Sequence, residues 1–367
     1  MMAPLRVALV GPLPPPAGGM ANQTRQLAEL LRGEGLDVTL VQTNRPYQPA
    51  WLGHLRGLRA LGRLVPYGLA LWRACGQADV MHLMANSGWA WHLFAAPALW
   101  VARRRGVPVV VNYRGGGAPD FLARAAGRVR PQMLGAAAMV VPSGFLQQVF
   151  ERFSIGSQIV PNVVDLRRFS PADPDVTQQR LPHLVVTRNL EPVYDNATAL
   201  RAFAIVLQQW PAARLTIAGS GPELARLQAL ANELHVAGNV AFVGRLDRAD
   251  MAALYRSASL MLNPSRTDNT PNSVLEAWAS GVPVVSTRVG GVPFLVEHGR
   301  TGLLVPPRDA EAMAEAALSV LCEPALHASL VQAGLREAQR YTWEQVRPLL
   351  LATYHRVLSP VAGAHRA

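Results

Sequence analysis

The chain contains no lysine, so all 35 of its basic residues are arginine. It has only two cysteines, Cys75 and Cys322, which are far apart and do not form a CxxC pair. Neither a disulfide framework nor a zinc site is therefore indicated, and a reducing compartment is expected. The N-terminal apolar run is short, interrupted by prolines and without a small-residue cleavage pattern, which favours a first strand over a signal peptide.

Long hydrophobic runs are also scarce. One uncharged stretch, residues 80–102, has the length of a membrane span, but it contains histidine, asparagine, serine, glycine and proline. That polar content favours a buried strand, a loop and a helix. With 367 residues and 50% hydrophobic content, the chain is long enough for two domains with substantial cores.

The net positive charge of the chain arises entirely in its first half. Residues 1–170 hold 18 arginines against 7 acidic residues, and residues 171–367 hold 17 of each, so the whole formal charge of +11 arises before residue 171. This asymmetry indicates an anionic partner for the first half, either a phospholipid surface, a lipid-linked phosphate or nucleic acid. The alternative is an arginine-rich composition without function.

Short β-branched runs alternate with helical patterns in both halves, which is typical of parallel sheets with crossover helices. A proline-rich and charged stretch between residues 163 and 182 interrupts this rhythm, and we place the domain boundary near residue 170. The predicted domains are 1–170 and 171–342. The expected strands lie at 6–11, 37–43, 79–84, 107–113 and 138–143, and then at 184–189, 213–219, 239–244, 259–265, 282–288 and 301–307.

Two segments outside these strands are amphipathic. Residues 343–358 form a helical pattern that needs a packing surface. Residues 51–74 place Arg56, Arg59, Arg63 and Arg73 among tryptophan, leucine and tyrosine, a pattern typical of a helix at a membrane interface. An ordinary helix whose arginines face water explains the second pattern equally well.

A glycine turn follows the first strand. Gly18 and Gly19 directly precede a helical pattern, so bare backbone amides and the positive helix end can approach an anion there. The turn has neither the GxGxxG spacing of a dinucleotide fold nor a P-loop, so neither specific interpretation applies. A plain tight turn remains the alternative.

The most informative segment is residues 263–291, where a strand leads through a polar loop into a helix predicted to begin at Ser273. Asp268 in the loop and Glu276 in the first turn of that helix are eight positions apart, which suits two carboxylates that bind different hydroxyls of one ligand. Both would lie at the carboxyl ends of parallel strands, where such sheets bind ligands. Alternatively, Asp268 caps a turn and Glu276 complements the helix N-terminus.

This segment resembles the signature of glycosyltransferase family 4, the retaining GT-B enzymes, in which two acidic residues eight positions apart precede A-x-A-x-G-x-P-V-V-x-T-x-x-G-G. Here the second part runs from Glu276 to Gly290 and Gly291. The resemblance extends to the glycine turn, LTIAGSGPE at 215–223, NVAFVGRL at 239–246, HGRTGLLVPP at 298–307 and the closing YTW helix. It implies two Rossmann-like doubly wound domains that face a cleft, with the closing segment 343–367 packed back on the first domain.

The resemblance also implies roles for individual residues. Arg188 would bind phosphate, Asp268 the hydroxyls of the donor sugar, in place of the family's usual glutamate, and Glu276 the ribose; these three are the catalytic candidates. Arg245 would lie near the base. The pyrophosphate or sugar would face Gly18, Gly19 and the amides of Asn269 and Thr270 after Asp268.

Two customary side chains are replaced. The family often has a lysine about five residues after the arginine, where this chain has Val193 and Tyr194. Its usual first-domain histidine near the acceptor corresponds to Arg114, the acceptor-side candidate. His82 is interpreted as structural, and Asp173 and Asp175, in the interdomain connection, do not indicate a metal site.

These observations predict a retaining, metal-independent glycosyltransferase that needs no cofactor besides its nucleotide-diphosphate sugar donor. The acceptor would be lipid-linked or a glycan in cell-envelope or exopolysaccharide synthesis, and the protein would be cytoplasmic, with peripheral association at the inner face of the plasma membrane. Two alternatives stay open: a pseudo-glycosyltransferase that only binds nucleotide or glycan, and a sugar-nucleotide epimerase of the same architecture. Nucleic acid is not expected as a partner, because no recognition motif is present.

Overall fold

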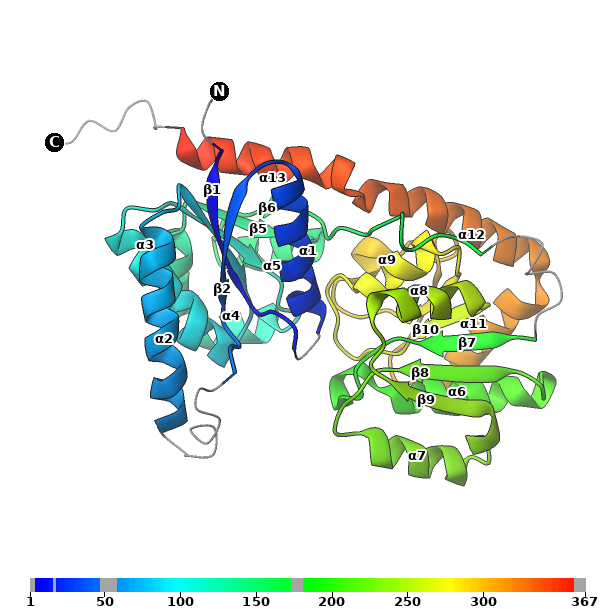
Figure 1. The fold of residues 1–367 in the computed structure, drawn as a ribbon. Helices are drawn as coiled ribbons and strands as arrows, with labels where there is room; N and C mark the ends of the chain where they lie inside the picture. Colours follow the sequence, from blue (N-terminus) through cyan, green and yellow to red (C-terminus); the bar gives the residue numbers. More distant parts are fainter. Residues whose placement is uncertain (1–3, 16–17, 47–57, 173–180, 360–367) are drawn as a thin grey trace. The chain divides into compact units, whose positions relative to one another are not determined.

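The computed structural model describes residues 4–15, 18–46, 58–172 and 181–359 (Figure 1). The chain divides into two compact units, of which the first comprises residues 1–161 and 346–367 and the second residues 162–345. The division thus falls before the boundary expected near residue 170, because the segment after Pro161 makes its contacts within the second unit. Val164, for example, donates a backbone hydrogen bond to Tyr341.

The first unit contains a six-stranded parallel sheet in the order β2-β1-β3-β4-β5-β6. The five strands expected from the sequence are present, and the two-residue edge strand β6 is an addition that was too short to stand out. The strands are β1 (Arg6–Gly11), β2 (Asp37–Gln42), β3 (Val80–Ala85), β4 (Val109–Tyr113), β5 (Ala138–Val141) and β6 (Gln158–Ile159).

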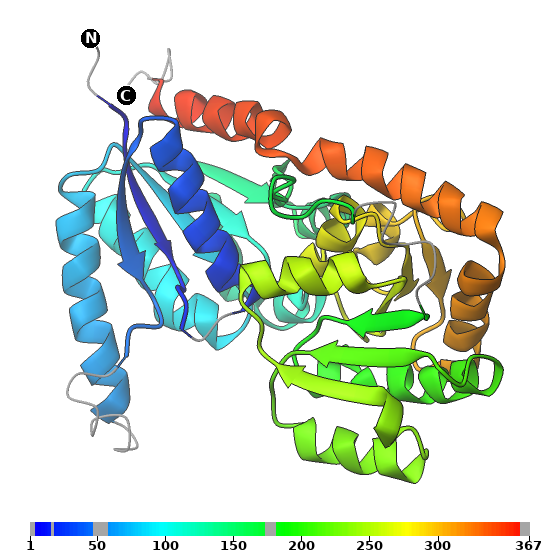
Figure 2. The ribbon, with the colours of Figure 1, turned by 45° about the vertical axis from the view of Figure 1, so that its right-hand side comes forward.

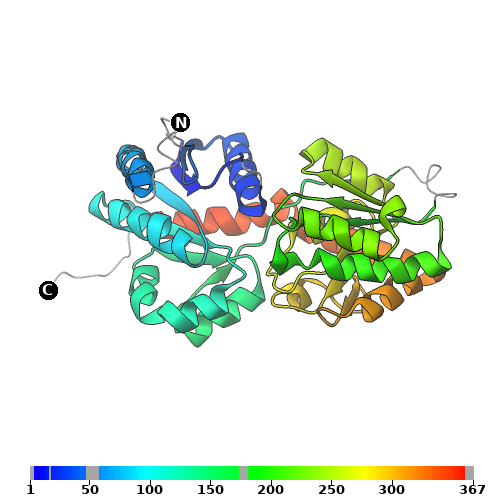
Figure 3. The ribbon, with the colours of Figure 1, turned by 90° about the horizontal axis from the view of Figure 1, so that it is seen from below.

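Helices cover both faces of this sheet (Figures 1 and 3). On β3, Met81 and Leu83 point into the core that the sheet forms with α2 to α5, whereas His82 points to the opposite face. The helices of the first unit before the interdomain connection are α1 (Gly19–Gly33), α2 (Leu58–Cys75), α3 (Ala96–Arg104), α4 (Ala118–Leu134) and α5 (Gly144–Arg152), with a π-helical turn at Trp91–Ala95.

The second unit repeats this plan with a six-stranded parallel sheet in the order β12-β11-β10-β7-β8-β9. All six strands were expected, although each is shorter than its sequence pattern. They are β7 (His183–Val186), β8 (Arg214–Ala218), β9 (Val240–Gly244), β10 (Leu260–Asn263), β11 (Val284–Thr287) and β12 (Leu303–Val305).

Successive residues of β7 divide between two cores. Leu184 and Val186 pack with α6, α7 and α11, whereas Val185 packs with α8, α9 and α10 on the other face. A strand that is apolar on both sides is typical of a doubly wound sheet. The helices are α6 (Asn196–Gln209), α7 (Leu224–Glu233), α8 (Arg248–Ser257), α9 (Asn272–Ala279), α10 (Val292–Leu295), α11 (Ala310–Cys322) and α12 (Pro324–Ala338).

The closing amphipathic pattern is helix α13 (Trp343–Leu358), which lies beside the sheet of the first unit (Figures 1 and 2). Tyr354 of α13 is fully buried and hydrogen-bonds to His82 on β3. Arg347 pairs with Glu34 at the end of α1, with 3.0 Å between Nη1 and Oε2. The predicted return of this helix to the first domain is therefore confirmed.

Among the helices of the described ranges, none is by itself long and apolar enough to cross a bilayer. Ala310–Cys322 and Pro324–Leu358 meet that criterion only when taken as one pair bent by 98°. Residues 80–102 form β3, a loop, the π-helical turn and most of α3, as their polar content predicted.

Candidate functional site

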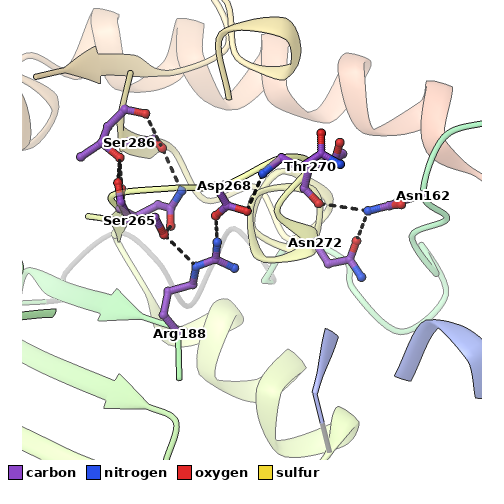
Figure 4. A network of polar contacts seen from close by, with 10 residues as sticks. Asn162, Arg188, Ser265, Asp268, Thr270, Asn272 and Ser286 are labelled. Carbon is purple, nitrogen blue, oxygen red and sulfur yellow. Dashed lines mark hydrogen bonds and ion pairs between the residues drawn. The ribbon is translucent and has the colours of Figure 1, made fainter. Parts of the chain in front are cut away.

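The second unit brings two expected site residues, Arg188 and Asp268, into direct contact (Figure 4). Arg188 follows β7, and Asp268 lies in the loop between β10 and α9. Because β7 and β10 are parallel neighbours, their carboxyl ends meet at one edge of the sheet. Nη2 of Arg188 forms an ion pair with Oδ2 of Asp268, and the two side chains are only 12% and 13% exposed.

The guanidinium of Arg188 is held by two further groups. Its Nε donates a hydrogen bond of 3.2 Å to the hydroxyl of Ser265, and its Cζ lies 4.7 Å from the centre of the Tyr194 ring. Burial lowers the pKa of Arg188, while Tyr194 and Glu276 oppose this shift. A guanidinium has five N–H donors, so the pairing with Asp268 leaves capacity for phosphate oxygens.

A chain of buried polar side chains supports Ser265. Its hydroxyl donates to Oδ1 of Asn263 at 2.9 Å, and Nδ2 of Asn263 donates to the hydroxyl of Ser286 at 2.9 Å (Figure 4). Because the Ser265 proton is directed at Asn263, a lone pair of the same oxygen is free to accept from Arg188. Sequence reasoning missed this chain, although polar residues at the ends of two adjacent strands were visible in NPS and VVST.

Two glycines shape the backbone under Asp268. A Cβ on Gly290 would lie 2.2 Å from the carbonyl oxygen of Asp268, and one on Gly291 would lie 2.3 Å from that of Asn269. Gly290 also has a φ of +50°, which disfavours other residues, and the amide of Gly291 donates to the Asp268 carbonyl at 3.0 Å. The paired glycines of the signature therefore position the Asp268 loop.

A second pair of glycines lies under Arg188. A Cβ on Gly219 would lie 2.1 Å from the carbonyl oxygen of Arg188, and one on Gly221 would lie 2.2 Å from that of Leu190. The amide of Leu190 also donates to the carbonyl of Ser220 at 3.1 Å. The segment 215–223 thus admits the Arg188 backbone at a distance that only glycine allows.

Glu276 lies on α9, which begins at Asn272 and has no acidic residue in its first turn. The prediction of a start at Ser273 with Glu276 in the first turn is therefore wrong, because Pro271 already serves as N-cap. Since the helix end field is concentrated in the first turn, complementing that end is not the role of Glu276.

Near Glu276, the buried hydroxyl of Tyr255 donates to the carbonyl of Ser273 at 3.1 Å and lies 2.7 Å from the hydroxyl of Thr187. Burial raises the pKa of Glu276 to about 7, and the nearby charges of Arg248 and Arg188 act against that rise. Tyr255 is completely buried and was not identified from the sequence. The carboxyl therefore titrates near neutral pH.

The loop between Asp268 and α9 is tied down by hydrogen bonds (Figure 4). The Asn269 amide donates to Oδ1 of Asp268 at 3.0 Å. Nδ2 of Asn162 donates to the Thr270 carbonyl at 3.0 Å and to Oδ1 of Asn272 at 2.7 Å. The Asp268 carboxylate thus contacts both the backbone of its own loop and Arg188.

The other residues predicted for the site are Arg245 in the second unit and Gly18, Gly19 and Arg114 in the first. Arg245 follows β9, is exposed and donates from Nε to the Ser220 hydroxyl at 2.6 Å. In the first unit, Gly18 is the N-cap of α1 in an extended conformation, and a Cβ on Gly18 or Gly19 would meet no described atom within 4 Å. Arg114 directly follows β4 in the same unit.

Family models match both units of the chain. The model described as "Glycosyltransferase Family 4" matches residues 17–168, and the model described as "Glycosyl transferases group 1" matches residues 182–323. The chain belongs to glycosyltransferase family 4. It is therefore a glycosyltransferase enzyme of the GT-B fold.

Curated relatives agree with this assignment. A D-inositol 3-phosphate glycosyltransferase of Segniliparus rotundus is 27% identical over 93% of this chain and 85% of its own length. A protein of the same name from Saccharomonospora viridis is 31% identical, over 54% of this chain and 50% of its own. The chain thus spans only half the length of the second relative.

Solved structures with the same fold cover nearly the whole chain. The sucrose-phosphate synthase of Thermosynechococcus elongatus has a TM-score of 0.77 at 22% identity, covering 97% of this chain and 99% of its own. Anabaena HepE, solved with UDP and glucose, has a TM-score of 0.74 at 18% identity, covering 96% of this chain and 99% of its own. At these identities the likeness establishes the fold.

Proposed function

We propose that this glycosyltransferase moves a sugar from a nucleoside diphosphate sugar to a lipid-linked or glycan acceptor in cell-envelope or exopolysaccharide synthesis, with retention at the anomeric carbon. One observation carries the proposal: a cation, Arg188, and two carboxylates, Asp268 and Glu276, gather at the carboxyl ends of the strands of one Rossmann-like sheet. The negative charge of a diphosphate would pair with Arg188. The hydroxyls of the sugar and of the ribose would donate hydrogen bonds to Asp268 and Glu276.

The donor is proposed to bind to the second unit. Arg188 stabilises the charge that develops on the departing diphosphate, and Glu276 accepts hydrogen bonds from the ribose when it is ionised. Asp268 accepts hydrogen bonds from the donor sugar, and the amides of Asn269 and Thr270 lie in the same loop. UDP is the first nucleotide to test, because HepE was solved with it.

No protein nucleophile is assigned to the reaction. The acceptor hydroxyl is proposed to attack the anomeric carbon from the face that the diphosphate leaves, and a leaving phosphate oxygen takes the hydroxyl proton. The new glycosidic bond then forms as the bond from sugar to phosphate breaks, which retains the configuration. Positive charge comes from Arg188, and no metal ion or further cofactor is assigned.

The first unit is proposed to supply acceptor binding, with Arg114 as its cation. The relatives named for D-inositol 3-phosphate make this compound the first acceptor to test. An acceptor that carries a phosphate also agrees with the positive charge of the first 170 residues.

An anionic membrane surface is the proposed location, on the cytoplasmic side. Helices α2 and α3 expose four large apolar side chains, which are Val65 (57%), Leu69 (55%) and Trp72 (44%) of α2 and Trp100 (56%) of α3. The first three follow one helical face, and α2 packs against α3. We call these four residues the α2–α3 apolar patch.

Arginines accompany both tryptophans of the α2–α3 apolar patch. Arg105 lies 4.7 Å from the Trp72 ring and Arg104 lies 4.9 Å from the Trp100 ring. Tryptophan beside arginine is typical of surfaces that bind anionic lipid headgroups. Of the segment that suggested this role from sequence, Arg56 and the side chain of Arg59 lie outside the described residues.

A donor and acceptor panel tests the proposal. Binding of UDP, GDP and ADP and of their sugars is measured by thermal shift, and release of nucleoside diphosphate is then followed with and without D-inositol 3-phosphate or lipid-linked and glycan acceptors. Release that depends on the acceptor, with the anomeric configuration of the product retained by NMR, supports the proposal. Conversion of the donor sugar without any acceptor indicates an epimerase, and tight binding without turnover indicates a pseudo-glycosyltransferase.

A further inference from the structure

A buried hydrogen-bonded chain crosses the first unit from α13 to Arg114. The Tyr354 hydroxyl lies 2.8 Å from Nδ1 of His82, and Nε2 of His82 lies 3.1 Å from Nδ2 of Asn112. Oδ1 of Asn112 accepts from Nε of Arg114 at 3.0 Å, and Nη1 of Arg114 donates to Oε1 of Gln23 on α1 at 2.9 Å. Tyr354, His82 and Asn112 are at most 1% exposed.

The alternation of the sheet explains why these side chains meet. Neighbours of His82 on β3 and of Asn112 on β4, such as Leu83 and Val111, point into the core with α2 to α5. His82 and Asn112 therefore share the opposite face, where Tyr354 reaches them. Polar residues at the centre of a buried sheet face are costly unless each finds a partner.

Arg114 determines which atom donates and which atom accepts in each hydrogen bond of the chain. A guanidinium only donates, so the oxygen of the Asn112 amide must face it. The amide nitrogen of Asn112 then donates to Nε2 of His82, which must be without a proton. The single imidazole proton consequently lies on Nδ1 and is donated to the oxygen of Tyr354.

This arrangement requires a neutral imidazole. Burial, together with the smaller effect of the Arg114 charge, lowers the pKa of His82 to about 3. A protonated Nε2 would face the donor group of Asn112 and would turn that amide away from Arg114. The neutral state and a single tautomer thus keep the acceptor of the Arg114 Nε–H in place.

We propose that Tyr354 is a positioning residue, which fixes the guanidinium of Arg114 through His82 and Asn112. The C-terminal helix thereby contributes to acceptor binding without touching the acceptor. This inference rests on the proposed role of Arg114, but the geometry of the chain does not depend on that role. The tautomer set through Asn112 is also held by Tyr354, which accepts the Nδ1 proton. Loss of the Tyr354 oxygen leaves that proton without its acceptor and makes the other tautomer competitive, after which Asn112 can turn and Arg114 loses a fixed acceptor.

The variant is Tyr354→Phe, and Tyr67→Phe is its matched control. Tyr67 is also a buried tyrosine of the first unit, and its hydroxyl donates to the carbonyl of Phe94 at 2.9 Å, away from the chain to Arg114. Both changes remove one buried hydroxyl and keep the ring, so both should lower stability by a similar amount. Only Tyr354→Phe should alter His82 and Arg114.

Nitrogen-15 NMR of labelled histidine and arginine provides a readout that a merely structural role would not change. In the wild type, His82 should show a protonated Nδ1 and a bare Nε2 at neutral pH. In Tyr354→Phe this tautomer should lose its dominance, and solvent exchange of the Arg114 Nε–H should accelerate about fivefold or more, as expected for one lost hydrogen bond. A protonated Nε2 in the wild type, or exchange within twofold of Tyr67→Phe, overturns the inference.

Kinetics separate this inference from the proposed function. With the acceptor that supports turnover, Tyr354→Phe should raise the acceptor KM about fivefold and leave the donor KM unchanged, unlike Tyr67→Phe. If Arg114→Ala leaves the acceptor KM unchanged, the acceptor role of Arg114 fails and the NMR result alone decides on positioning. If Arg114→Ala raises that KM and Tyr354→Phe does not, the positioning role is wrong.

Discussion

Arg188 and Asp268 neutralise one another in the structure, although the proposed donor needs both of them for other groups. Their ion pair is largely buried, so separation of the two charges is costly unless each finds a new partner. A nucleotide sugar offers phosphate oxygens to Arg188 and hydroxyls to Asp268. A free nucleoside diphosphate offers phosphate oxygens to Arg188 but no sugar hydroxyls to Asp268. The ion pair therefore favours binding of the nucleotide sugar over binding of the nucleoside diphosphate product.

Asp268→Asn should therefore change the two affinities in opposite directions. Without the carboxylate, Arg188 is available to phosphate, and UDP should bind at least about tenfold more tightly, because Arg188 no longer has to give up a charged hydrogen bond to Asp268. Turnover with the nucleotide sugar should fall at the same time. Calorimetric titration checks the prediction, with Glu297→Gln, which breaks the exposed pair with Arg300, as control. Weaker binding of UDP by the variant contradicts it.

Arg188→Ala should reduce turnover on the order of 100-fold to 1000-fold, because it removes a preorganised donor to the developing charge. Arg188→Lys should recover only part of the loss, since lysine cannot bind two phosphate oxygens in a fork or stack on Tyr194 in the same way. Arg266→Ala is the control, because Arg266 is exposed in the same loop as Asp268. Turnover of Arg188→Ala within about threefold of wild type, under roughly 0.7 kcal/mol of barrier, shows that Arg188 does not stabilise the diphosphate.

The periodic parts of the fold could be predicted because each strand carries its own signal. The apolar pattern around Val185 predicts a buried strand independently of the rest of the chain. The signature from Glu276 to Gly291 indicated the family. The edge strand Gln158–Ile159 was missed because two residues carry no periodicity. The start of α9 was misplaced because Pro271 caps it with no side-chain hydrogen bond.

The site was only partly visible in the sequence for a different reason. Val193 and Tyr194 indicated a lost lysine, but only three-dimensional proximity shows that the Tyr194 ring lies against Arg188. Asn263 and Ser286 are ordinary strand residues until the register of β10 and β11 brings them together. Polar contacts between residues this far apart in the chain produce no regular sequence pattern, so they could not be predicted from the sequence.

Glu276→Gln should flatten a pH dependence of stability. The pKa of Glu276 is raised from 4.5 to about 7 in the folded chain, so the folded state keeps a proton that the unfolded state loses. The free energy of unfolding therefore falls as pH rises from 4.5 to 7. Above pH 7 the decrease is complete, because Glu276 is then ionised in both the folded and the unfolded state. Chemical denaturation of both proteins at pH 4.5, 6 and 8 measures this slope, and an unchanged slope in the variant contradicts the prediction.

The ionised form of Glu276 is the one that accepts hydrogen bonds from ribose, so donor affinity of the wild type should increase as pH rises through 7. In Glu276→Gln it should be weaker by about tenfold or more, as for loss of a hydrogen bond to a charged group, and independent of pH in this range. The same samples, titrated with donor, provide the measurement.

The double variant Trp72→Ser, Trp100→Ser should reduce binding to anionic vesicles by about tenfold or more. It removes two exposed rings of the α2–α3 apolar patch, each of which contributes transfer free energy on burial. Flotation with vesicles of phosphatidylglycerol and phosphatidylcholine at low and high salt measures the effect. Val243→Ser, on the exposed face of β9 in the second unit, is the control. If the wild type does not float with anionic vesicles, the membrane proposal is wrong.

Gly290→Ala should impair donor binding and stability together, although Gly290 touches no substrate in the proposal. A methyl group there would lie 2.2 Å from the carbonyl oxygen of Asp268, and the residue has a φ of +50°. The Asp268 loop must move to admit the methyl group, which separates Asp268 from its position at Arg188.

Gly299→Ala is the matched control in the same unit, because Gly299 has a φ of +78° but no described atom within 4 Å of the added methyl group. Both variants should lose about 1 to 3 kcal/mol of stability from backbone strain, which thermal and chemical denaturation measure. Only Gly290→Ala should also raise the donor KM, by tenfold or more if one charged hydrogen bond is lost. Equal donor KM values for the two variants would mean that the close approach of Gly290 to Asp268 does not position the site.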